Sequence, residues 1–137
     1  MGEVRLEKPF KIHGIELISF SIQPQQYREY RKETLEFNIQ QEHKTNVEKR
    51  LIIVFTTVTI RETEKDMILA QLQVACGYEI SPFESLIKKD KDGDFVIPHD
   101  LNVAVSRISI ATTRGILYTQ LRGSYLQNST LPVLPIE

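Results

Sequence analysis

The sequence predicts an α+β fold in which an antiparallel sheet comes first and the helices follow. Four stretches between residues 12 and 81 alternate apolar and polar residues with the period of two that is typical of strands. The C-terminal third instead repeats its apolar residues with a helical period. Strands that are grouped before helices favour an antiparallel sheet. At 137 residues, the chain is expected to form one domain, 1–137.

Composition and charge exclude several classes of protein. The formal net charge is −1, so the chain lacks the basic field that attracts nucleic acids. The single cysteine, Cys76, leaves too few thiols for a disulfide or a zinc-thiolate site. No apolar run approaches the roughly 20 residues of a membrane span, and the first residues hold no apolar signal core. We therefore expect a cytoplasmic protein with no cofactor, no metal, no nucleic-acid partner and no membrane insertion.

The first two predicted strands differ in how clearly their faces separate. Residues 34–44 alternate cleanly, with Leu35, Phe37 and Ile39 on one side. In residues 12–22 the alternate positions that we assign to the core are less uniformly apolar. The positions between them also carry apolar residues, Ile15 and Leu17. The residues of the assigned core parity are Ile12, Gly14, Glu16, Ile18, Phe20 and Ile22.

Residues 50–62 form the strongest predicted strand, because β-branched residues dominate it. One face is apolar, with Ile52, Val54, Val58 and Ile60, and only Thr56 interrupts it. The opposite face begins apolar, with Leu51, Ile53 and Phe55, and then becomes polar. A strand that is apolar on both sides needs cover on both sides. We therefore predict that Leu51, Ile53 and Phe55 form an oligomer interface, with cover by the chain's own loop as the alternative.

The fourth predicted strand, residues 67–81, is followed by a short helix at 82–89 and a turn. Cys76 lies in the strand's apolar row, so we expect a structural rather than a reactive thiol. The row consists of Ile68, Ala70, Leu72, Val74, Cys76, Tyr78 and Ile80. Residues 90–94, DKDGD, resemble the start of a calcium loop, but the glycine is misplaced and Leu101 stands where such loops carry glutamate. A solvated turn is the better interpretation.

Residues 101–115 fit a helix better than a strand, since neither set of alternate residues would give an apolar strand face. A helical stripe gathers Leu101, Ala104, Val105, Ile108 and Ala111. The polar residues Asn102, Ser106, Ser109 and Thr113 then fall on the opposite side. We expect this helix to end at Gly115, which suits a C-terminal cap. A weaker helical repeat follows, with Leu117, Leu121, Ser124 and Tyr125.

No pattern in the sequence indicates catalysis. The three histidines, His13, His43 and His99, have no ligand-like spacing to one another or to Cys76. Phosphate-binding and nucleophile motifs are absent. We therefore do not expect an enzyme.

The order of the segments resembles SecB, the bacterial export chaperone, and the SecB-like proteins. ISFSIQP at 18–24 is similar to the family's first-strand ISFEAP, and ILAQLQVACGYEI at 68–80 to its fourth-strand FLxEVQQxGxFxI. SRISIATTRG at 106–115 is similar to the end of its long helix, ITSMVSRG, and LPVLP at 131–135 to LAPVNF. No single motif is specific, and the resemblance rests on their order and spacing.

The resemblance implies a four-stranded antiparallel sheet with helices packed on one face. It also implies homodimers that pair into homotetramers, and nucleotide-free binding of unfolded or extended polypeptide. The positions that match the family's export-docking carboxylates are Leu17, Ser21 and Gln71, and none is acidic. Residues 117–128 replace the family's second long helix. The resemblance therefore implies a chaperone for another client, such as an antitoxin or a mobile-element protein, rather than export coupling.

We predict that aromatic and leucine side chains form the client-binding groove, where they hold apolar side chains of an extended peptide. The predicted groove residues are Tyr27, Tyr30, Leu121, Tyr125 and Leu126. Packing of the helix on the sheet is the alternative role for each of them. Two other classes of function remain open at this stage. One is a small-ligand protein or enzyme with a cavity between sheet and helix, and the other is a purely structural oligomer or adaptor.

Overall fold

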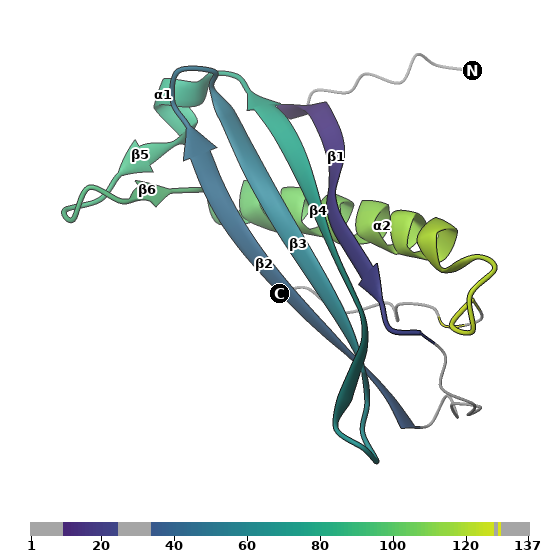
Figure 1. The fold of residues 1–137 in the computed structure, drawn as a ribbon. Coiled ribbons are helices and arrows are strands. Elements are labelled where there is room, and N and C mark those ends of the chain that lie inside the picture. The colour runs from purple at the N-terminus through teal and green to yellow at the C-terminus, as the bar shows by residue number, and fades with distance from the viewer. Residues whose placement is uncertain (1–9, 25–33, 128, 130–137) are drawn as a thin grey trace, which may run out of the picture.

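The computed structural model describes residues 10–24, 34–127 and 129. Four long strands come first, a short helix and a small hairpin follow, and one long helix comes last (Figure 1). The elements are β1 (Phe10–Ile22), β2 (Leu35–Asn46), β3 (Leu51–Glu62), β4 (Met67–Ile80), α1 (Phe83–Leu86), β5 (Lys88–Lys89), β6 (Phe95–Val96) and α2 (His99–Leu121). The predicted α+β class, with strands before helices, is confirmed.

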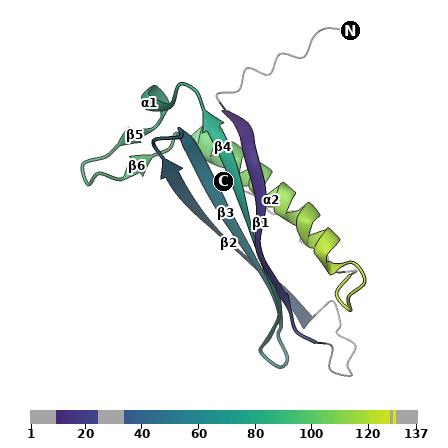
Figure 2. The ribbon, with the colours of Figure 1, turned by 45° about the horizontal axis from the view of Figure 1, so that its top comes forward.

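The long strands form one antiparallel sheet with the order β1-β4-β3-β2, so β1 and β2 are its edges. Helix α2 lies against one face of this sheet (Figure 1). The short β5–β6 hairpin projects from the end of the sheet that carries α1, and Figure 2 shows the same arrangement from a second direction. The predicted four-stranded antiparallel sheet is therefore confirmed, with a single long helix as its cover.

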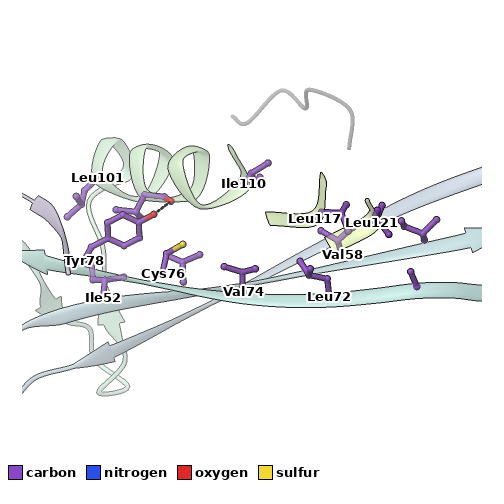
Figure 3. Packing of buried hydrophobic residues seen from close by; sticks show 14 of the residues in the cluster. Ile52, Val58, Leu72, Val74, Cys76, Tyr78, Leu101, Ile110, Leu117 and Leu121 are labelled. Atoms are coloured by element: carbon purple, nitrogen blue, oxygen red, sulfur yellow. Dashed lines mark hydrogen bonds between the residues drawn. The ribbon is translucent and has the colours of Figure 1, made fainter. Parts of the chain in front are cut away.

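The core lies between α2 and the two central strands. On β3, the predicted core face of Ile52, Val54, Val58 and Ile60 is buried. On β4, Leu72, Val74, Cys76 and Tyr78 point toward α2 (Figure 3). The predicted β4 row is wrong at Ile68, which is 49% exposed, because a register shift beside Ile60 places Leu69 in the core instead.

Strand β1 carries two β-bulges that the alternation did not predict. Its register with β4 shifts between Ile12 and Gly14 and again between Leu17 and Ser19. Each bulge reverses the parity of the side chains beyond it. The predicted core face is therefore wrong in the middle of the strand, where Gly14 and Glu16 lie on the side away from α2. The side chains on the α2 side are Phe10, Ile12, Ile15, Leu17, Phe20 and Ile22.

Helix α2 is rotated relative to the predicted stripe. Ala111 is exposed and Ala104 and Ile108 are only half-buried, while Ser106, Ser109 and Thr113 are buried. The predicted polar side is thus part of the buried face. Short hydroxyl side chains can be buried at this position because each finds a hydrogen-bond partner on the sheet or on the helix itself.

The predicted end of the helix at Gly115 is also wrong. The helix continues through Gly115 to Leu121, because Leu117 and Leu121 extend the buried face by two further turns. Gly123, just after the cap residue Arg122, has φ +80° and takes the terminating role instead. The predicted weaker helical repeat therefore belongs to the same helix.

The predicted turn at residues 90–94 lies between β5 and β6. One carboxylate oxygen of Asp90, Oδ1, accepts hydrogen bonds from the backbone N–H groups of Asp92 (2.9 Å) and Asp94 (3.0 Å). Gly93 has φ +82°, which favours glycine. These contacts explain DKDGD as a turn. No helix in the described residues is long and apolar enough to cross a membrane.

Candidate functional site: exposed apolar surfaces of the sheet and helix

The helix-side face of β1 is apolar and uncovered. Ile12 and Ile15 are each 49% exposed and Leu17 is 39% exposed, although all three lie on the same face as the core. Helix α2 packs mainly on β3 and β4 and leaves these side chains open to solvent. We call Ile12, Ile15 and Leu17 the β1 strip. A row of large aliphatic side chains on an edge strand is typical of an interaction surface.

The side of α2 that faces away from the sheet is mixed in character. Ala111, Gly115 and Tyr118 are exposed there, and Tyr118 shows 53% of its surface. The exposed Arg107 and the half-buried Arg114 lie on the same side, so the apolar residues are interspersed with charge. The rotation of the helix explains this face, because the serine side is buried and the alanine side is left outside.

The predicted interface residues lie on the other face of the sheet, away from α2. Leu51 is only 5% exposed, and Ile53 and Phe55 are half-buried. The ammonium of Lys44 lies 5.2 Å from the centre of the Phe55 ring. An open depression of about 370 Å³ lies beside Leu51 and Ile53 and reaches Gly14 and Gly77. The apolar end of β3 thus lies on the face away from α2 and is largely buried at Leu51, and its role as an interface stays a prediction.

The predicted groove residues do not share one environment in the structure. Tyr27 and Tyr30 lie outside the described residues. Leu121 and Leu126 are buried in the core, while Tyr125 is half-buried and its hydroxyl donates a hydrogen bond to the backbone carbonyl of Gln23 at 2.8 Å. The segment after α2 is therefore attached to the end of β1.

Polar contacts at two places, which the sequence pattern did not predict, join the sheet to α2. The Tyr78 hydroxyl donates to the backbone carbonyl of Val105 at 3.2 Å and lies 2.7 Å from the Ser109 hydroxyl (Figure 3 shows this side chain pointing at the helix). At the β2 edge, His43 Nε2 lies 3.1 Å from Ser106 Oγ, and Gln41 donates to the Ser106 carbonyl at 3.2 Å. These contacts fix the position of the helix along the sheet.

Burial shifts the titration of the groups at this junction. It lowers the pKa of His43 below its ordinary 6.5, which favours the neutral imidazole. Burial also raises the pKa of the Tyr78 phenol and of the Cys76 thiol. Cys76 is therefore a buried neutral thiol, as predicted. Among the described residues, no group of three His, Cys, Asp or Glu side chains could hold a metal ion.

Comparison with known proteins gives a match at the level of the fold. No family model matches the chain, and no curated protein matches it by sequence. One similar solved structure is a SecB-like chaperone of Mycobacterium tuberculosis, in complex with a ChAD peptide from the HigA1 antitoxin. It superposes with a TM-score of 0.60 at 15% identity, and the match covers 92% of this chain and 91% of the other. The fold is SecB-like.

Proposed function

We propose that this protein is a SecB-like chaperone that binds unfolded or extended polypeptide without nucleotide. The observation that carries the proposal is the β1 strip, with three large aliphatic side chains 39–49% exposed on the core side of the sheet. A surface of this kind is costly to leave in water and suits a partner with apolar side chains. The peptide complex of the similar M. tuberculosis chaperone supports a polypeptide as that partner.

The same argument extends to assembly. A homodimer or homotetramer would bury apolar surface that one chain leaves open, and the β1 strip is the candidate for that contact. The predicted interface at Leu51, Ile53 and Phe55 is the competing surface. We place the protein in the cytoplasm and assign it a binding rather than a catalytic role.

The predicted groove at Tyr27, Tyr30, Leu121, Tyr125 and Leu126 remains part of the proposal. Because Leu121 and Leu126 are buried, they contact a client only after the last turn of α2 and the segment that follows it move off the sheet. The hydrogen bond between Tyr125 and the Gln23 carbonyl would then break. An antitoxin-like client fits this proposal better than an export client, since the matching docking positions Leu17, Ser21 and Gln71 carry no charge.

Aggregation of a chemically unfolded client tests the proposed function. We expect the purified protein to slow light scattering by a diluted unfolded protein when it is present in equimolar amount, without ATP. A set of unrelated extended peptides should bind with measurable heat. Failure in both assays would refute the chaperone proposal. A metabolite that raises the melting temperature, in the absence of any effect from peptides, would point instead to a small-ligand protein.

A further inference from the structure

The two edges of the sheet differ in regularity. Edge strand β1 has two register shifts against its neighbour, while β2 pairs with β3 over twelve consecutive residues without a shift. Bulges twist an edge strand and interrupt its row of free backbone groups, which protects it from pairing with another strand. Strand β2 has no bulge and no proline. Within residues 10–24, 34–127 and 129, its outer edge is therefore the one that keeps a continuous row of hydrogen-bonding groups without a strand partner.

The register identifies which backbone groups of β2 point outward. The N–H of Thr63 donates to the carbonyl of Thr34 at 2.8 Å, so residues 34 and 63 form a hydrogen-bonded pair. Hydrogen-bonded pairs alternate along an antiparallel ladder. The even-numbered residues of β2 therefore bond to β3, and the odd-numbered ones direct both backbone groups away from it. These outward residues include Phe37, Ile39 and His43.

The side chains along this edge also alternate in chemistry. On the α2 side, Leu35, Phe37 and Ile39 are half-buried and pack against the core. On the opposite side, Glu36 and Glu42 are exposed and lie six residues apart, and the exposed Lys44 follows at the far end of the row. An added strand would place alternate side chains beside these two rows. The row on the α2 side favours apolar residues, and the two carboxylates favour basic ones.

We propose that the free edge of β2 binds one extended client segment as a fifth strand of the sheet. This inference rests on the proposed chaperone function and names its client class. The segment has apolar residues at alternate positions, and two Lys or Arg residues six apart that face Glu36 and Glu42. Backbone hydrogen bonds supply the sequence-tolerant part of the binding, and the side-chain rows select the register.

Amide hydrogen exchange with a designed peptide tests the proposal. The probe is a twelve-residue peptide with isoleucine at alternate positions and two lysines six apart on the other face. Binding should slow exchange at the amides of Phe37, Ile39 and His43. The amides of Asn38 and Gln40 already bond to β3 and should change little, and the amides of β1 should not change.

Two N-methylated versions of the peptide provide a matched control. Methylation of alternate amides that face β2 removes the donors, so binding should fall to background. Methylation of the other set leaves those donors in place, and binding should persist. Equal binding of both versions, or protection confined to β1 or to α2, would overturn the edge proposal while leaving the chaperone function intact. No binding of any peptide, together with no effect on aggregation, would instead refute the proposed function itself.

Charge variants test the selection of register. Glu36→Gln and Glu42→Gln should each weaken binding of the lysine peptide about two- to fivefold, the size expected for an exposed ion pair. A peptide with glutamine in place of lysine should bind both variants with the same affinity as it binds the unchanged protein. Glu48→Gln, in the exposed turn after β2, is the matched control and should have no effect. Equal losses in all three variants would contradict the proposed register.

Discussion

At the scale of single residues, Gly115 and Gly123 have the same neighbour in sequence and different roles. Each follows an arginine, but Gly115 lies in the middle of α2 and Gly123 lies beyond its end with φ +80°. A glycine inside a helix costs conformational entropy, whereas a glycine at positive φ avoids a steric penalty. Sequence alone does not separate them, because the deciding factor is whether Leu117 and Leu121 find a surface to pack on.

Alanine at each glycine should therefore act in opposite directions. Gly115→Ala places a methyl group in open space and should raise the free energy of unfolding by about 1 kcal/mol. Gly123→Ala forces an L side chain into the left-handed region and should lower it by about 1–2 kcal/mol. Urea unfolding followed by circular dichroism measures both. A stabilising effect of Gly123→Ala would contradict the assignment of Gly123 as the helix terminator.

His43 should make stability sensitive to mild acid. Its pKa is lowered in the folded protein, so the unfolded chain binds a proton more readily. The free energy of unfolding is therefore expected to fall as the pH drops below about 6.5 and through the lower folded pKa. His43→Gln should reduce this fall, as measured by urea midpoints at pH 7.5 and pH 5. An identical pH dependence in the variant would exclude His43 as a contributor.

At the scale of elements, the sequence predicts strands better than it predicts their faces. The core face of β3 is confirmed because this strand is regular and β-branched throughout. The predicted core face of β1 is wrong in the middle of the strand, because a bulge adds one residue there and no residue type marks its position. Ile15 and Leu17, which break the alternation, are the only sign of it. The face of α2 is wrong because Ser106 and Ser109 are buried by partners on distant strands, His43 and Tyr78.

The contact between Tyr78 and Ser109 should be the main polar tie between β4 and α2. Tyr78→Phe removes the buried hydroxyl and leaves Ser109 without that partner, which should cost about 1–3 kcal/mol. Ser109→Ala in the Tyr78→Phe background should cost less than in the unchanged protein, since the shared hydrogen bond is already lost. A double-mutant cycle from urea unfolding gives the coupling. Strict additivity would show that the two hydroxyls do not interact.

At the scale of the whole molecule, the structure exposes apolar surface in places that the sequence did not identify. The doubly apolar end of β3 predicted an interface, yet Leu51 is nearly closed to solvent. The β1 strip is more exposed. The sequence pattern did not predict it, because the bulge changes which residues of β1 face α2. The predicted groove stays a prediction, and two of its residues, Tyr27 and Tyr30, lie outside the described residues.

Sedimentation of two charge variants should show which surface assembles the protein. Ile15→Lys places a charge in the β1 strip, and we expect it to shift the protein toward the monomer. Ile53→Lys places the same charge on the opposite face of the sheet, beside Leu51, and should leave the oligomer intact. The reverse pattern would support the interface that the sequence predicts. Circular dichroism of both variants checks that the fold is retained.

The difference between the two edges also sets how many strands the sheet can recruit. Because the bulges interrupt the β1 edge, the proposed strand partner joins each sheet along β2. Each chain is then monovalent, and its sheet ends a growing stack of strands instead of bridging two of them. On this basis each chain should cap one end of a β-rich aggregate, so that a dimer or a tetramer holds two or four such ends at once.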